Sequence, residues 1–342
     1  MRVLIVGAGA IGTMIGGVLT RAGHRVTYLD LPQVVEKIKS SKIRVEGLGD
    51  VIETSDFDAV DDIAGLDPFD LCVVAVKSYC TRAAMEKVTD DVASVILTFQ
   101  NGLDNEELLS ERYGPHRVVG GSITYPVALL DTGYVRIENS RGGIGLAPVE
   151  GSLDISEIVE IFTRGGMQVI STGDYRSLKW SKLLLNLICN ATCAILDMTP
   201  GEIFSDRRLV AIEQRQIQEA LRVMDRRRIP VMNLPGYPVI PFTALYRVSP
   251  PSVLKLLMKK KIARGRGDKK PSLLLEMEKG SGCTEVRYLN GAVYRQAFSA
   301  ALRAPVNKIL YETLEDIVRG FISPDDFRRN PENFLNLFRL GK

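Results

Sequence analysis

The most constraining feature of this 342-residue chain is a glycine pattern in its first dozen residues. A β-branched run, RVLIV, leads into a GxGxxG segment. A helix-forming stretch follows to about Arg21, and Arg25–Leu29 predicts a second strand. The segment consists of Gly7, Ala8, Gly9, Ala10, Ile11 and Gly12. In a β-α-β unit the three glycines allow a tight turn, close approach of a pyrophosphate, and helix–strand packing. The pattern therefore predicts a dinucleotide-binding domain with the phosphates at the helix N-terminus.

Asp30 follows Gly12 by eighteen residues and ends the predicted second strand. A carboxylate at this place accepts hydrogen bonds from the ribose hydroxyls of the adenosine and repels a 2′-phosphate. No arginine occurs between positions 28 and 36 to favour that phosphate. Asp30 therefore predicts NADH as the preferred cofactor and leaves NADPH open. The alternative is that Asp30 only caps the segment that follows it.

Three further apolar runs, 71–76, 95–99 and 118–123, are typical of parallel strands that are covered on both faces. Lys77 follows the first run and Asn101 follows the second. Ligands of open α/β sheets bind outside the carboxyl ends of the strands. Lys77 and Asn101 are therefore predicted to lie beside the bound ligand.

After about Thr172 the pattern changes to helices, and residues 174–196 predict one long apolar helix. Lys182, Asn186 and Asn190 occur at i, i+4 and i+8 in it, which places them within an arc of about 80°. Asparagine is a poor helix former and is uncommon on an ordinary exposed helix face. The stripe therefore indicates a polar cavity, and the alternative is the solvent-exposed edge of an amphipathic helix.

The length and these patterns predict two domains, residues 1–172 and 173–342. Residues 229–251 are rich in proline and predict an irregular loop. Residues 255–270 contain eight basic residues and one aspartate, a net charge of +7 in a chain of net charge +3. This basic segment is interpreted as a solvated helix end and loop, or as a patch for an anionic partner or a cofactor phosphate. No aromatic residue interleaves it, which argues against a nucleic-acid partner.

Composition excludes several classes of protein. The hydrophobic content of 45% and charged content of 25% exclude a mainly disordered chain. The five cysteines form no CxxC pair and only two histidines occur, so no metal site is predicted. No stretch of 18 apolar residues occurs, so no membrane span is expected. A cytoplasmic enzyme fits these observations, and a homodimer is the usual closed assembly for such enzymes.

These motifs resemble the ketopantoate reductase (2-dehydropantoate 2-reductase) family over nearly the whole chain. The resemblance rests on GAGAIG, AVKSY, QNG, WSKLLLNLICN and CTEVRYLNG, which occur in the family's order. It implies an α/β fold, in which an N-terminal Rossmann dinucleotide-binding domain is followed by a mostly α-helical C-terminal domain. The active site of such a chain is expected in the cleft between the two domains.

The resemblance also implies roles for individual residues. Lys182 matches the general acid, and Glu285 and Asn101 match positions that serve both substrate and cofactor. The residues expected to hold the substrate are Asn101, Asn186, Asn190, Ser272 and Glu285. The chain departs from the family in two places: Asp30 stands where NADPH-selective members have a basic residue, and residues 229–270 look like an insertion.

The function expected from the residues and the resemblance is NAD(P)H-dependent reduction of a 2-oxo acid. Ketopantoate is the expected substrate and pantoate the product, as in pantothenate and coenzyme A biosynthesis. One alternative is a paralogous dehydrogenase that acts on another 2-oxo acid or on an imine. Another alternative is a non-catalytic sensor that binds the dinucleotide.

Overall fold

The computed structural model describes residues 1–265, 270–280 and 282–339, and only the backbone of residues 259–265. The chain divides into two compact units. The first contains Met1–Lys182 together with Asn233–Pro238, and the second contains Leu183–Met232 together with Val239–Lys342. Of the predicted basic segment at 255–270, the side chains of residues 259–269 lie outside the described residues.

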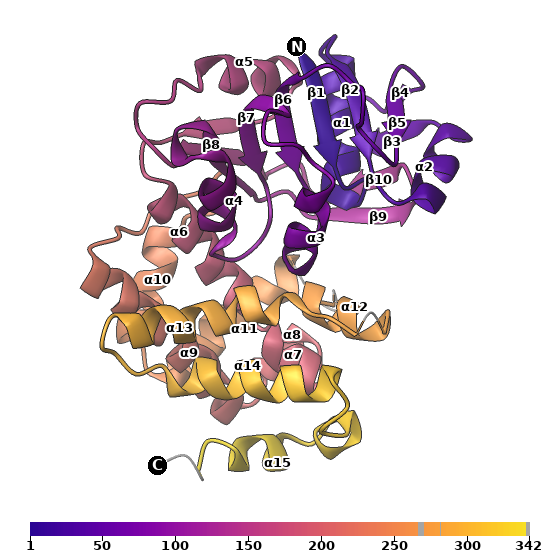
Figure 1. Cartoon of the computed structure of the whole chain (residues 1–342). Helices are drawn as coiled ribbons and strands as arrows, with labels where there is room; N and C mark the ends of the chain where they lie inside the picture. The colour runs from indigo at the N-terminus through magenta and orange to yellow at the C-terminus, as the bar shows by residue number, and fades with distance from the viewer. Residues whose placement is uncertain (266–269, 281, 340–342) are drawn as a thin grey trace. The chain divides into compact units, whose positions relative to one another are not determined.

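The first unit is built on an eight-stranded sheet (Figure 1). The strands stand in the order β12 (Val169–Ser171), β11 (Ile144–Pro148), β8 (Val118–Ile123), β7 (Ala93–Thr98), β6 (Phe69–Val74), β1 (Arg2–Val6), β2 (Arg25–Leu29) and β5 (Asp58–Val60). All neighbours pair in parallel except β8 and β11, which are antiparallel. The carboxyl ends of β1, β2, β6, β7 and β8 therefore share one edge, as the predicted doubly covered sheet requires.

Helices cover both faces of this sheet, because successive residues of each strand point to opposite sides. Val3 and Ile5 belong to a core with α1 (Ala10–Arg21) and α5 (Ser156–Arg164). Leu4 and Val6 belong to a second core on the other face, with α3 (Thr81–Glu86) and α4 (Asn105–Tyr113). The remaining short helices of this unit are α2 (Pro32–Lys39), η1 (Ser78–Cys80) and η2 (Pro115–Arg117).

A second sheet of four strands covers α1 from outside. Its order is β4 (Ile52–Thr54), β3 (Ile43–Glu46), β10 (Tyr134–Ile137) and β9 (Val127–Asp131). Val45 and Val135 from this sheet share a core with Met14 of α1. Helix α1 thus lies between two sheets, and its glycines allow the close packing: a Cβ at Gly17 would stand 2.7 Å from the Val45 side chain.

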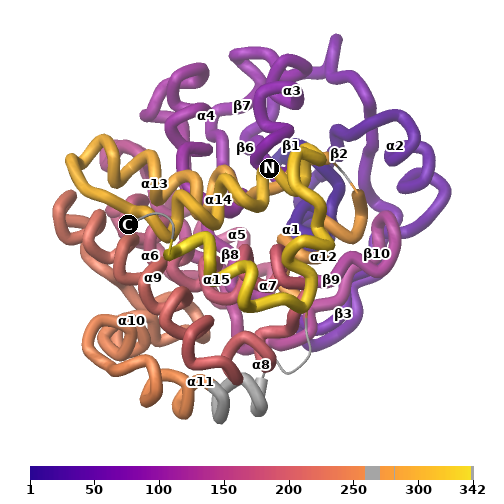
Figure 2. The backbone as a smooth tube through the Cα atoms, turned by 90° about the horizontal axis from the view of Figure 1, so that it is seen from below, coloured from indigo at the N-terminus to yellow at the C-terminus, as the bar shows by residue number. Residues whose placement is uncertain are grey.

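The second unit is helical and is organised around α9 (Arg207–Arg227), which contacts α10 (Val239–Val248), α11 (Pro251–Gly265), α13 (Asn290–Ser299) and α14 (Pro305–Val318). Helices α13 and α14 run side by side (Figure 2). The other elements are α7 (Ala191–Leu196), α8 (Pro200–Ile203), α12 (Ser272–Glu278), η3 (Glu285–Tyr288), η4 (Pro324–Asp326) and α15 (Pro331–Asn336). Together with the first unit, this confirms the predicted fold class.

The prediction of one continuous helix over residues 174–196 is wrong. Helix α6 (Tyr175–Leu187) ends before Cys189, whose φ of 53° lies in the left-handed region, and α7 begins after Asn190. Asn190 is therefore the N-cap of a new helix and not the third member of a stripe. Only Lys182 and Asn186 share a helix face.

Glu213 of α9 stabilises this break from 24 residues away. Its buried carboxylate accepts hydrogen bonds from the Cys189 backbone N–H at 2.7 Å, the Thr192 hydroxyl at 2.5 Å and the Gln216 amide at 2.8 Å. The left-handed residue costs free energy, and these three hydrogen bonds offset part of that cost. Burial raises the pKa of Glu213 to about 7.

The prediction of an irregular loop over the proline-rich residues 229–251 is also partly wrong, because α10 lies within it. Pro241 falls in the first turn of α10, and Pro251 is the first residue of α11. Proline is tolerated at these positions, where its missing N–H would have no helical partner. The short segment Asn233–Pro238 packs into the first unit, where the Thr124 hydroxyl donates to the Pro235 carbonyl at 2.8 Å.

Replacement of Glu213 by Gln tests the electrostatics of the break. The raised pKa means that the folded chain holds the Glu213 proton more tightly than the unfolded chain, whose pKa is near 4.5. Stability from this group is therefore present below about pH 4.5 and lost as pH rises through about 7. The loss amounts to roughly 3 kcal/mol, at about 1.36 kcal/mol per pKa unit.

A glutamine can keep the bonds to Cys189 and Thr192 without a charge. We expect the Tm of Glu213→Gln to rise relative to wild type as the pH increases from 5 to 8, measured by scanning calorimetry. A difference in Tm that stays constant over that range would contradict the argument.

Candidate active site

The GxGxxG segment forms the turn between β1 and α1, and its three glycines differ in their surroundings. Gly7 has a φ of +99°, and a Cβ there would meet the Val76 backbone nitrogen at 2.9 Å. A Cβ at Gly12 would stand 1.8 Å from the Gly7 carbonyl oxygen. At Gly9, by contrast, a Cβ would meet nothing within 4 Å. Two glycines thus serve packing, and the middle one leaves open space over the turn.

The start of α1 has the properties of an anion site. Its N-cap is Gly9, which supplies no capping side chain, and the first turn contains no acidic residue. The first N–H groups of the helix and the positive end of its dipole are therefore not neutralised by a carboxylate of the helix itself. These residues fit the pyrophosphate of a dinucleotide.

Asp30 stands beside this turn at the carboxyl end of β2. One carboxylate oxygen accepts a hydrogen bond from the Ala8 backbone N–H at 2.6 Å, and the other accepts from Leu31 at 2.7 Å. The N-cap of α2 is Leu31, with no side-chain cap, so Asp30 does more than close the next helix. It ties the glycine turn to β2 and keeps a half-buried carboxylate beside it.

Lys77 follows β6, which neighbours β1 in the sheet, and Asn101 follows β7, which neighbours β6. Lys77 is exposed and Asn101 is half-buried. The Asn101 carbonyl accepts hydrogen bonds from the Ser78 hydroxyl at 3.0 Å and the Asn105 amide at 3.1 Å. The structure thus brings the glycine turn, Asp30, Lys77 and Asn101 to one edge of the first unit.

Gln100 was not singled out from the sequence, yet it organises this edge. Its amide nitrogen donates to the Val76 carbonyl at 2.9 Å and to the Thr81 hydroxyl at 2.7 Å. These bonds connect the residue before Asn101 to the residue before Lys77. Its only signal in the sequence is its place in the QNG motif, in which the predicted site residue is the asparagine.

Helix α6 contains two lysines in consecutive turns, and they differ in environment. Lys179 is buried and forms an ion pair with Glu106, with 2.8 Å between Nζ and Oε1. Lys182 is half-buried and ends the first unit. Asn186 is one turn further along the helix and is also half-buried. Neither Lys179 nor Glu106 was predicted, because a helical lysine in a sequence is usually an exposed one.

In the second unit the structure brings Asn190 and Ser272 together. The Asn190 amide nitrogen and the Ser272 hydroxyl are 3.2 Å apart, and the Asn190 amide oxygen accepts from the Leu273 N–H at 3.0 Å. Asn190 thereby serves the N-terminus of α12, whose N-cap is Pro271.

Glu285 is buried at the start of η3, only 2% exposed. Its backbone N–H donates to the buried carboxylate of Glu276 at 3.0 Å. The preceding Thr284 caps η3, because its hydroxyl accepts from the Val286 N–H. The Glu285 carboxyl group is therefore not needed as the cap of this turn.

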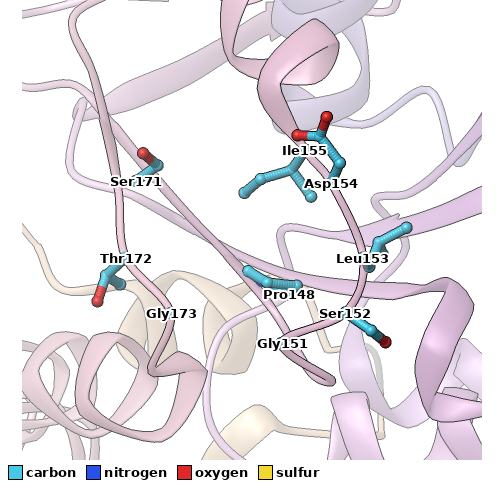
Figure 3. Close-up of a pocket in the computed structure, with 9 residues that line it drawn as sticks. All are labelled: Pro148, Gly151, Ser152, Leu153, Asp154, Ile155, Ser171, Thr172 and Gly173. Atoms are coloured by element: carbon cyan, nitrogen blue, oxygen red, sulfur yellow. The ribbon is translucent and has the colours of Figure 1, made fainter.

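The first unit also has an open pocket of about 460 Å³, whose lining residues are shown in Figure 3. It is lined by the loops after β11 and β12, and β11 runs antiparallel to β8. Its one carboxylate, Asp154, accepts hydrogen bonds from the Ser156 N–H and hydroxyl. The pocket is therefore separate from the edge that holds the glycine turn.

Neither a metal-binding cluster nor a membrane-spanning helix is found among the residues that the structure describes. No group of three or more His, Cys, Asp or Glu side chains there is placed to hold a metal ion. None of the described helices combines the length and hydropathy of a membrane span.

Solved structures show the same fold over almost the whole chain. A PanE/ApbA family ketopantoate reductase from Ralstonia eutropha superposes with a TM-score of 0.78 at 24% identity, over 94% of this chain and 99% of that one. D-mandelate dehydrogenase with NADH and anilino(oxo)acetate superposes with a TM-score of 0.76 at 19% identity, over 93% and 99%. At these identities the likeness concerns the fold alone.

Sequence comparison identifies the family. The chain is 29% identical to a 2-dehydropantoate 2-reductase of Pyrococcus horikoshii, over 91% of this chain and 95% of the relative. The corresponding protein of Archaeoglobus fulgidus is 27% identical, over 93% and 97%. Residues 3–151 match the model of ketopantoate reductase PanE/ApbA, and residues 174–318 match that of its C-terminal part. The chain therefore belongs to the ketopantoate reductase (PanE/ApbA) family of oxidoreductases, as its motifs predicted.

Proposed function

We propose that this protein reduces ketopantoate (2-dehydropantoate) to pantoate with NAD(P)H. One observation carries the proposal: in a chain of this family, the half-buried Lys182 and Asn186 share a face of α6. The complete glycine turn with Asp30 beside it supports the use of a dinucleotide. The proposed cofactor contacts are the turn Gly7, Ala8, Gly9, Ala10, Ile11 and Gly12, with Asp30, Lys77, Asn101 and Glu285.

When bound, the reduced nicotinamide supplies the hydride that the ketone carbon accepts. Negative charge then develops on the ketone oxygen, which needs stabilisation and a proton. Lys182 supplies both if it enters the reaction as the ammonium, because its charge stabilises the alkoxide and its Nζ–H protonates it. The half-buried position of Lys182 strengthens this interaction relative to bulk water.

The asparagines and Glu285 have a binding role in this proposal. Asn101 and Asn186 offer neutral donors to the substrate carboxylate, and they need no titration to do so. Asn190 and Ser272 present a hydrogen-bonded hydroxyl and amide together. The Glu285 carboxylate can accept a hydrogen bond from a substrate hydroxyl.

We propose NADH as the preferred cofactor, with NADPH a weaker second. The half-buried Asp30 carboxylate lies next to the glycine turn, where it repels a 2′-phosphate and accepts from ribose hydroxyls. Structures of a related fold contain NADH, as in D-mandelate dehydrogenase.

The first measurement is NADH oxidation with ketopantoate, followed at 340 nm. We expect turnover with ketopantoate to exceed turnover with other 2-oxo acids, supplied with and without amines. Faster NADH oxidation with another 2-oxo acid, or with a 2-oxo acid and an amine, would indicate a paralogous dehydrogenase. Tight binding of NADH without turnover on any compound would favour a sensor.

Cofactor preference is tested with Asp30→Asn. This change keeps an amide oxygen for the Ala8 N–H and removes the charge. We expect kcat/KM to be higher for NADH than for NADPH in wild type, and the ratio to shift towards NADPH in the variant. An unchanged ratio, or a wild type that prefers NADPH, would show that Asp30 does not select the cofactor.

The role of Lys182 is tested with Lys182→Ala. General acid catalysis contributes about 10²- to 10⁴-fold, so kcat should fall by that factor. NADH binding, measured by fluorescence titration, should stay unchanged. Arg176→Ala is the matched control, because Arg176 is an exposed cation on the same helix that stacks on Tyr175. Turnover of Lys182→Ala equal to that of the control would remove Lys182 from the mechanism.

A further inference from the structure

The ion pair between Lys179 and Glu106 is buried to an unusual degree for two charges. The side chains are 3% and 1% exposed. Burial removes the hydration of both the ammonium and the carboxylate, and two apolar side chains would fill the same volume without that cost. The pair therefore needs an explanation beyond the stability of the sheet.

The Lys179 ammonium connects three elements of the first unit. Its Nζ donates to the Gln100 carbonyl at 2.7 Å, at the end of β7, and to the Gly121 carbonyl at 3.2 Å, in β8. The Glu106 carboxylate, 2.8 Å away, belongs to the first turn of α4. One charged group thus holds α6 against both strands and against α4, which no apolar side chain could do.

The residues that Lys179 contacts or precedes lie next to two proposed site residues, Asn101 and Lys182. Gln100 immediately precedes Asn101, and Lys182 is one helical turn after Lys179. Glu106 is next to Asn105, whose amide donates to the Asn101 carbonyl at 3.1 Å. A shift of the α6 turn relative to β7 would therefore change the separation of Lys182 and Asn101.

Lys179 itself is not suited to be the proton donor. Its ammonium is buried, and three protein oxygens surround it. Lys182 is the more accessible amine on the same helix. The two lysines of KWSK thus have separate tasks.

We propose that Lys179 and Glu106 form a positioning pair, which fixes the turn of α6 that carries Lys182 against the end of β7 that carries Asn101. The inference rests on the role of Lys182 given under Proposed function. It predicts that geometry, and not only stability, is lost when the pair is removed. A misplacement of about 1 Å can cost on the order of 10²-fold in rate.

The test compares Lys179→Met with the double variant Lys179→Met/Glu106→Met. The single variant leaves a carboxylate buried and unpaired, so both Tm and kcat should fall. The double variant removes that carboxylate, so its Tm should recover towards wild type. Its kcat should stay ten- to a hundredfold below wild type, with the KM for NADH unchanged. Recovery of kcat together with Tm would show a merely structural pair and overturn the proposal.

A second readout needs no substrate. The rate at which trinitrobenzenesulfonate labels Lys182, followed by peptide mass spectrometry, should rise in the double variant, while the exposed Lys87 keeps its rate. An unchanged rate at Lys182 would overturn the positioning role.

Comparison with Lys182→Ala separates the two hypotheses. If kcat falls in Lys182→Ala but not in the double variant, the result supports the proposed mechanism and contradicts the positioning role of Lys179 and Glu106. If Lys182→Ala is fully active, the mechanism itself fails, and labelling of Lys182 still decides whether the pair holds it.

Discussion

The close approach of α1 to the glycine turn is the constraint on which the first unit depends. A Cβ at Gly12 would stand 1.8 Å from the Gly7 carbonyl, so the helix can begin here only without a side chain at that position. This contact sets the direction of α1 between its two sheets. It also brings Ala8 to the end of β2, where Asp30 accepts its N–H. The packing of α1 and the position of the glycine turn beside Asp30 thus have one origin.

Local signals explain why this part of the fold could be predicted. The bounds of β1, β2 and β8 were those expected, because each is an apolar run bounded by turn residues. The edge that holds Asp30, Lys77 and Asn101 followed from the rule that parallel strands share their carboxyl ends. In each case the relevant neighbours are close in sequence or fixed by sheet topology.

Long-range interactions explain the failures. The break after α6 puts Cys189, a residue with a side chain, in the left-handed region, and the sequence around it reads as continuous helix. The stabilising carboxylate comes from Glu213 in another helix. Lys179 likewise reads as a surface residue, and its partner Glu106 is 73 positions away in the chain. The periodicity of apolar residues along the sequence carries no information about pairs so far apart.

The break after α6 also places Asn186 and Asn190 in different environments, although their spacing in the sequence made them look equivalent. Asn186 remains on the face of α6 with Lys182, whereas Asn190 faces α12 and bonds Ser272 and Leu273. An amide suits the second task because its nitrogen donates to the Ser272 hydroxyl while its oxygen accepts from the Leu273 N–H. A carboxylate could only accept, and an ammonium could only donate. The predicted stripe of Lys182, Asn186 and Asn190 on one helix is therefore interrupted, and the hydrogen bonds of Asn190 belong to the join between two helices.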